Sequence, residues 1–177
     1  MNEITGAAAE TLIARLLDQR ESGRFETKRV SGKMVGKALE TICAFANTQG
    51  GTLALGLEDA TKAQGCERLY GLAENPEATD ELRRKVLTHL LPEIANIRWT
   101  RVACTLRDGS SGHVLLATVP QSAKVHSIRD DGTWTRLDAS NREMNASEIT
   151  ELSYRRGTIS AESEPVPVPF ELLETET

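Results

Sequence analysis

Four charged residues near the start of the chain have types and spacing that could act on a phosphodiester. Glu21 and Glu26 lie five residues apart in the stretch ESGRFETK, Lys28 follows, and Asp59 ends the stretch AFANTQGGTLALGLED. Three carboxylates that converge on one point repel one another unless a cation neutralises them, and oxygen-only ligands suit Mg²⁺ or Mn²⁺. Such a metal polarises a phosphoryl oxygen, and Lys28 would stabilise phosphate charge beside it.

The same four residues have a second interpretation as ordinary surface charges. A strand is predicted over 25–30, and side chains alternate along a strand, so Glu26 and Lys28 share one face. An acid and a lysine in that relation are common on solvated sheets. The metal site requires Asp59 to come from a neighbouring strand, so from spacing alone both interpretations stay open.

Hydrophobic periodicity predicts the elements that must position these side chains. Helices are expected over 7–20, over 35–47, from the cap at Asn75 to Leu91, and after a capping box of Asn145 with Glu148. Strands are expected over 25–30, 52–57, 97–106 with a bulge near Arg101, and 114–119, and in a hairpin that joins 125–128 to 133–137. The sequence therefore predicts an α+β fold with a mixed, largely antiparallel sheet packed by about four helices.

Composition and charge predict one domain followed by a tail. The chain has 177 residues and 39% hydrophobic residues, enough for one core. We expect a domain over 1–157 and an acidic, proline-rich tail or the start of a linker over 158–177. Five of the 26 acidic residues follow Arg156 and none of the 21 basic residues does, so residues 1–156 are neutral overall. A neutral domain neither supports nor excludes a nucleic-acid partner.

The compartment is expected to be cytoplasmic. No apolar run is long enough to span a membrane, and the stretch MNEITGAAAE lacks the features of a secretory signal. Cys43, Cys66 and Cys104 are odd in number and widely spaced, which predicts neither a disulfide framework nor a zinc site.

A second group of residues could contact nucleic acid. Lys124 and His126 lie beside the predicted hairpin, where a phosphate contact or acid–base role is conceivable for the histidine. Trp134 and Arg136 share a strand face and could stack a base and hold a phosphate. Core packing is the more common role for such a pair. The NTQGG segment from Asn47 could direct backbone N–H groups at a phosphate, but a helix C-terminus is the favoured interpretation.

Three segments in this order resemble the Schlafen/AlbA-like domain family: ESGRFETK, AFANTQGGTLALGLEDA and TRLDASNREMNASEI. The resemblance runs from about Leu17 to Arg156. In nucleolytic Schlafens the two glutamates of the first segment and the aspartate of the second hold the metal. Carried onto this chain, these ligands are Glu21, Glu26 and Asp59. Eukaryotic Schlafens have two lobes and usually a zinc site, whereas this sequence has one lobe and no cluster of zinc ligands.

The resemblance implies a function but leaves its class open. The first hypothesis is a metal-dependent nuclease of Schlafen type, acting on RNA or single-stranded nucleic acid with Mg²⁺ or Mn²⁺. The second is a non-catalytic nucleic-acid-binding or assembly module of a bacterial regulator or defence system. A third, nucleotide binding at the Gly-Gly segment, lacks any GxxxxGK[ST] motif. A homodimer that restores a two-walled cleft and a monomer with a fused or separate partner domain are both consistent with a single lobe.

Overall fold

A computed structural model of the chain describes residues 1–31 and 33–163. The elements in chain order are β1 (Asn2–Ile4), α1 (Gly6–Asp18), β2 (Phe25–Lys28), α2 (Met34–Asn47), β3 (Gly51–Leu55), a 3₁₀ turn η1 (Gly65–Arg68), α3 (Pro76–Thr88), β4 (Leu90–Leu91), β5 (Arg98–Thr105), β6 (Ser111–Val119), β7 (Ser127–Ile128), β8 (Trp134–Leu137), β9 (Ser140–Glu143) and α4 (Ala146–Ser163). The predicted α+β class with a mixed sheet and four helices is confirmed.

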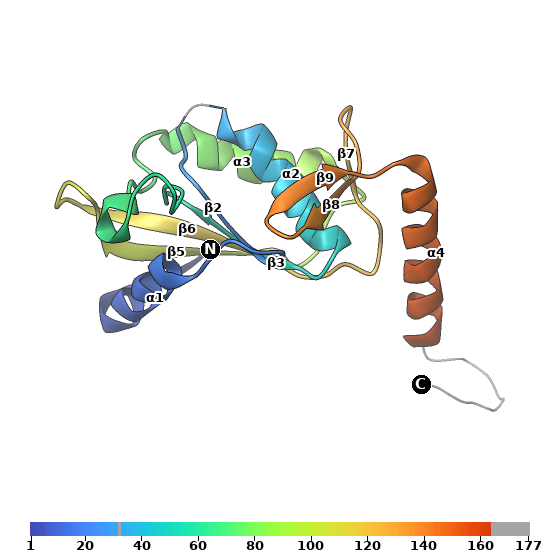
Figure 1. Cartoon of the computed structure of the whole chain (residues 1–177), viewed down its shortest axis with the longest axis horizontal. Helices are drawn as coiled ribbons and strands as arrows, with labels where there is room; N and C mark the ends of the chain where they lie inside the picture. Colours follow the sequence, from blue (N-terminus) through green and yellow to red (C-terminus); the bar gives the residue numbers. More distant parts are fainter. Residues whose placement is uncertain (32, 164–177) are drawn as a thin grey trace.

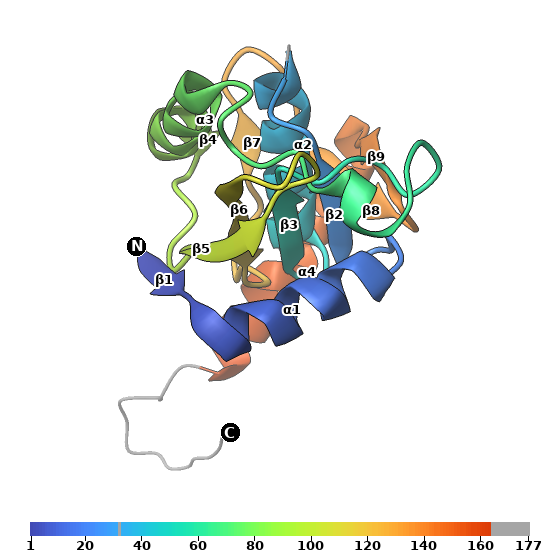
Figure 2. The same ribbon diagram turned by 90° about the vertical axis from the view of Figure 1, so that its left-hand side faces the viewer.

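A five-stranded sheet in the order β1-β5-β6-β3-β2 organises the fold. The two outer pairs, β1 with β5 and β2 with β3, are parallel, whereas β6 is antiparallel to both of its neighbours. Helix α1 covers one face of the sheet, and α2 and α3 cover the other (Figures 1 and 2). Because both faces are covered, β6 is a nearly continuous apolar run rather than an alternating one.

Two hydrophobic clusters lie on the two faces. Leu53, Leu55 and Leu115 face α2 and α3, and Phe25 and Val102 face α1. The change of apolar phase along β5 follows from this arrangement, since Trp99 packs against the first cluster and Val102 belongs to the second. β5 pairs one-to-one with β6 from Arg98 to Thr105. The bulge predicted near Arg101 is therefore wrong, because a strand that packs against an apolar cluster on each face shows apolar residues in either phase.

The region after α3 differs from the prediction. The helix ends at Thr88, and Leu90–Leu91 form a short strand that pairs with β7, so His89 caps the helix rather than lying within it. A bridge from Ile128 to Gly132 closes the turn at Asp130. The predicted pairing of 125–128 with 133–137 is wrong. β8 pairs instead with β9, a strand that the sequence did not indicate.

The last helix begins as predicted and extends past the expected domain boundary. The Asn145 amide donates to Glu148 and the Glu148 amide donates to Asn145, both at 2.9 Å, which is a reciprocal capping box. Helix α4 continues to Ser163, whereas the tail was expected to begin at 158; the remainder of that expected tail, 164–177, lies outside the described residues. Figure 1 shows α4 standing to one side of the sheet and of the three other helices. Within the described residues no helix is long and apolar enough to cross a membrane.

Candidate nucleic-acid interface

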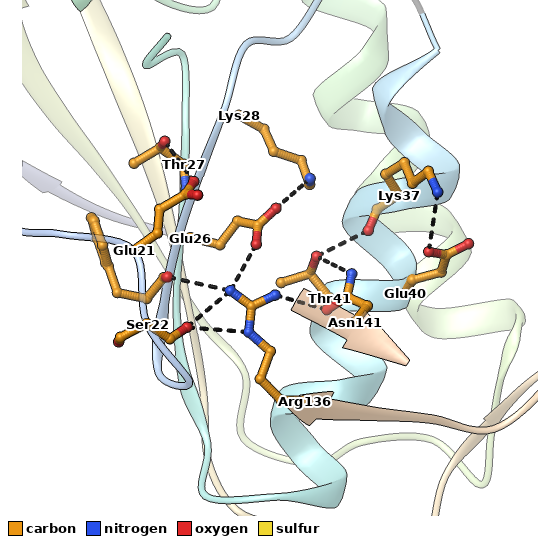
Figure 3. A network of polar contacts seen from close by, with 11 residues as sticks. Glu21, Ser22, Glu26, Thr27, Lys28, Lys37, Glu40, Thr41, Arg136 and Asn141 are labelled. Carbon is orange, nitrogen blue, oxygen red and sulfur yellow. Dashed lines mark hydrogen bonds and ion pairs between the residues drawn. The ribbon is translucent and has the colours of Figure 1, made fainter. Parts of the chain in front are cut away.

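The side chains of β2 divide between the two faces of the sheet, as the strand period requires. Glu26 and Lys28 point toward α2 and β8, whereas Thr27 points to the opposite side, where it meets Glu21 (Figure 3). The two glutamates of the ESGRFETK segment therefore lie on opposite sides of the strand.

The Glu26 carboxylate is almost completely enclosed and is paired with two cations. Its Oε1 atom lies 2.7 Å from Nη2 of Arg136, and its Oε2 atom accepts a hydrogen bond from Lys28. The side chains of Glu26 and Arg136 are only 10% and 1% exposed. A buried carboxylate is stable only when its charge is compensated in this way, so Glu26 is part of a buried ion network.

Arg136 is the centre of this network. Its Nε and Nη2 atoms donate to the Ser22 carbonyl at 3.2 and 3.0 Å, and Nη1 donates to Oδ1 of Asn141 at 2.8 Å. The guanidinium also lies 5.2 Å from the centroid of the Phe45 ring. Arg136 thus fastens β8 to the start of β2 and to α2. This placement does not support the predicted contact with a phosphate, because no face of the guanidinium is open to a ligand.

Glu21 and Asp59 are each engaged by a neighbouring threonine. Oε2 of Glu21 accepts hydrogen bonds from the backbone N and Oγ1 of Thr27 at 2.9 and 3.0 Å. Oδ1 of Asp59 accepts from the backbone N and Oγ1 of Thr61 at 2.8 and 2.9 Å, and these bonds lower the pKa of the carboxyl. The Asp59 contact, two residues along the chain, is a local turn cap, whereas the Glu21 contact joins the segment before β2 to the strand itself.

The arrangement does not fit the expected Mg²⁺ or Mn²⁺ site. Within the part of the chain that the structure describes, no three acidic, histidine or cysteine side chains are grouped so that they could hold a metal ion. Glu26 already faces two cations, and Glu21 lies across the strand from it. The polar network around Glu26 is explained by the fold itself and needs no metal to neutralise it.

Of the residues expected to contact nucleic acid, only Lys124 is exposed. His126 is 1% exposed; its Nδ1 donates to the Pro92 carbonyl at 2.6 Å and its Nε2 accepts from Ser122 at 2.5 Å. Trp134 packs against the cluster beneath α2, and its Nε1 atom is buried without a partner among the described residues. His126 offers no surface to a ligand, and the half-buried Trp134 packs its ring on the core, so this placement does not support their predicted role.

Asn47 has a structural role that the sequence did not reveal. Its side-chain nitrogen donates to the carbonyls of His126 and Trp134 at 2.9 and 2.8 Å, and its Oδ1 accepts from the His126 amide at 2.8 Å. Asn47 therefore holds two segments distant in sequence against the end of α2. Hydrophobic periodicity predicts apolar contacts, and it does not predict a buried side-chain amide that bonds to backbone groups distant in sequence.

The Gly-Gly pair that follows Asn47 is required by close packing. A Cβ atom on Gly50 would lie 2.7 Å from the Val119 carbonyl oxygen, and Gly50 has a φ of +77°. A Cβ on Gly51 would lie 2.8 Å from the Arg24 carbonyl oxygen and from the Phe45 ring. The glycines let α2 turn directly into β3, which agrees with the helix C-terminus interpretation and not with a phosphate cradle.

A polar groove separates α4 from the rest of the domain, and we call it the α4 groove. It consists of two adjoining hollows of about 460 and 490 Å³, which share Gln49 and Gln121 in their linings. Its arginines are Arg24, Arg142, Arg155 and Arg156, and its acids are Glu148 and Glu151. The groove therefore carries an excess of positive charge in a domain that is neutral overall.

The four arginines of the α4 groove differ in their availability. Arg156 donates to the Asn47 carbonyl at 2.7 Å, where it caps α2, and Arg142 is paired with Glu148 at 2.7 Å. Arg24 and Arg155 are exposed, and no carboxylate of the described residues pairs with either. These two cations are open to an anionic ligand.

Two solved structures are similar to this chain, and the first of them agrees with its fold. The DIP2311 protein from Corynebacterium diphtheriae has a crystal structure that matches 84% of this chain with a TM-score of 0.54 at 22% identity, a likeness that shows the fold. The chain spans about a third of that protein's length, 32%. The solution structure of the N-terminal domain of an ATP-dependent DNA helicase RecG-related protein from Nitrosomonas europaea matches 64% of this chain and 72% of that domain, at 26% identity with a TM-score of 0.44.

Curated proteins show no significant match to the sequence. The family described as "Schlafen, AlbA_2" matches residues 21–145, which is well over half of the chain and includes β2, the Gly-Gly turn and the β8–β9 hairpin. The chain therefore belongs to the Schlafen AlbA_2 family.

Proposed function

We propose that this domain binds nucleic acid through the α4 groove, by contacts to the phosphate backbone rather than to base edges. The observation that carries the proposal is the pair of exposed arginines without a carboxylate partner, Arg24 and Arg155, on a groove that Gln49 and Gln121 also line. Arginine forms bidentate hydrogen bonds with phosphate, and side-chain amides donate to phosphate and sugar oxygens. Family membership supports the same function.

The residues that line the α4 groove also predict its affinity, its salt dependence and its sequence preference for nucleic acid. The linings of both hollows contain no aromatic side chain among the described residues, so bases have no platform to stack on. Few phosphates can be neutralised by two free arginines, and the dependence of affinity on salt should be correspondingly shallow. We expect modest affinity and little sequence preference for an RNA or DNA strand.

Charge reversal tests this proposal. Arg24→Glu with Arg155→Glu should weaken binding of a labelled single-stranded RNA or DNA about tenfold or more at low salt, and should reduce the salt slope by about two. Arg129→Glu is the matched control, since Arg129 is exposed but does not line the groove. Fluorescence anisotropy at several salt concentrations measures both quantities. Equal losses in the control and the double variant would refute a localised interface.

The nuclease activity, the Mg²⁺ or Mn²⁺ cofactor, the homodimer and a partner domain stay predictions. Glu26, Glu21 and Asp59 have contacts that the fold explains, so we favour binding over cleavage as the function of the described domain. Light scattering tests the dimer: a mass near the 19.4 kDa of one chain, unchanged by added nucleic acid, would exclude it.

A further inference from the structure

A second cavity lies on the face of the sheet covered by α3, separate from the α4 groove. It has a volume of about 480 Å³, within the size range of small-ligand sites, and lies between α3 and the strands β5 and β6. Figure 2 shows α3 above the β1–β5 side of the sheet. Arg83 from α3 and Arg101 from β5 both line it, so two different elements contribute an arginine to one cavity. The Arg83 guanidinium also lies 5.5 Å from the centroid of the Trp99 ring.

Arg101 has an unsatisfied donor at this position. Its Nε atom is buried and has no hydrogen-bond partner among the described residues, and none of their carboxylates forms an ion pair with the guanidinium. A buried, unpaired donor on a charged group is costly, because desolvation is not offset by a new hydrogen bond. An acceptor in the cavity would remove that cost. Arg136 shows the contrast, since each of its nitrogens has a partner.

Neighbouring residues hold the Arg101 guanidinium in place. Nη2 of Arg101 lies 3.0 Å from Nδ1 of His113, and Nε2 of His113 lies 3.4 Å from Oε2 of Glu3. Because arginine can only donate, Nδ1 must accept, and the ring proton is then on Nε2, directed at Glu3. This chain of contacts orients the guanidinium without neutralising it directly, which is the arrangement expected of a preorganised anion contact.

The rest of the lining favours an organic anion over a bare ion. Leu72, Leu106 and Leu115 give the lining an apolar part, in which Leu115 is the cross-strand neighbour of Arg101, and Ser111 adds a hydroxyl. Leu106 is held there by two glycines: a Cβ on Gly71 or on Gly112 would lie 2.7 or 2.5 Å from its methyl groups. Asp80 is the acid in the lining, and it is exposed.

We infer that this cavity, the α3 cavity, binds a small organic oxyanion, with a phosphate or carboxylate group on Arg101 and Arg83 and an apolar body against Leu72, Leu106 and Leu115. The site shares no residue with the α4 groove and does not depend on nucleic-acid binding there.

Calorimetric titration with three simple probes tests the chemistry of this site. Phenyl phosphate and benzoate share an apolar ring and differ in the anionic group, and inorganic phosphate has the charge without the ring. We expect one of the two aromatic anions to bind at least tenfold more tightly than inorganic phosphate. Equal binding of all three, or no binding of any, would overturn the inference. If the phosphate probe binds and benzoate does not, the ligand is a phosphate ester; the reverse indicates a carboxylate.

Variants locate the binding. Arg101→Met removes the guanidinium and keeps the aliphatic stem, and it should weaken the preferred probe about tenfold or more. Arg83 is half-buried on α3, and Arg83→Met should also weaken binding of the preferred probe. This variant replaces Arg101→Met in the test if Arg101→Met fails to fold. Arg98→Met is the control, because Arg98 lies exposed on the same strand and does not line the cavity. The inference is wrong if the control loses as much affinity as the others, or if Arg83→Met and Arg101→Met bind normally. It is also wrong if an oligonucleotide alone, and no small anion, binds in an Arg101-dependent manner.

Discussion

The buried network around Arg136 and the α4 groove both contain arginines, but their surroundings differ completely. Arg136 is 1% exposed and its nitrogens are engaged by Glu26, Ser22 and Asn141. Arg24 and Arg155 are exposed and have no carboxylate partner among the described residues. The contrast indicates that the contacts of Glu26 and Lys28 in the ESGRFETK segment are explained by fold stability. The arginines free to bind a partner are Arg24, which lies between Glu21 and Glu26 in the same segment, and Arg155 in α4.

The largest expected effect tests the structural side of this contrast. Arg136→Met keeps the aliphatic volume but leaves Glu26 buried with only Lys28 beside it. Removing one partner from a buried ion pair typically costs about 3–5 kcal/mol, so the free energy of unfolding should fall by that order. Arg155→Met is the control and should leave stability unchanged while weakening nucleic-acid binding. Denaturant unfolding measures the first effect and anisotropy the second; comparable stability in both variants would contradict the comparison.

The sequence predicted the elements well where one apolar period was dominant. The helices around Leu39 and Leu82 and the capping box at Asn145 were correct, because each depends on local spacing. The β8–β9 pairing and the β4–β7 pairing were missed, since short strands with mixed burial leave almost no period to detect. The candidate site was the harder problem. Spacing placed Glu26 and Lys28 on one face correctly, but it could not show that Arg136, more than a hundred residues later, fills the space opposite them.

A smaller effect concerns the buried contacts of His126 with Asn47, Pro92 and Ser122. Burial is the main cause that lowers the pKa of His126 below 6.5; the positive charges of Lys124 and Arg156 lower it further, and the hydrogen bond to Pro92 opposes them. The unfolded chain therefore takes up a proton near pH 6.5 before the folded protein does. The stability that neutral His126 contributes is complete above pH 6.5 and is lost as the pH falls toward its folded pKa.

The pH dependence can be assigned with one variant and one control. His126→Gln lowers stability at every pH but should flatten the fall between about pH 6.5 and 5, the range set by the ordinary histidine pKa. The wild-type protein is the control and gives the slope that His126→Gln should reduce. Thermal unfolding across this range gives both slopes. An unchanged slope in His126→Gln would show that other groups cause the acid sensitivity.

The smallest expected effect is the response to metal, and it decides whether the polar network is only structural. Glu26 is neutralised by Lys28 and Arg136, and Glu21 lies on the other side of β2, so we expect millimolar Mn²⁺ or Mg²⁺ to leave the thermal midpoint unchanged, and a chelator likewise. A metal present at a hundred times its Kd would instead stabilise the folded state by about 2.7 kcal/mol.

Glu21→Gln is the informative variant, because glutamine keeps an acceptor for Thr27 and removes only the charge. Labelled RNA and DNA substrates, incubated with Mn²⁺ and with chelator, complete the test. Stabilisation by Mn²⁺ together with cleavage, both lost in Glu21→Gln, would mean that the carboxylates rearrange around a metal and that the network serves catalysis as well as the fold.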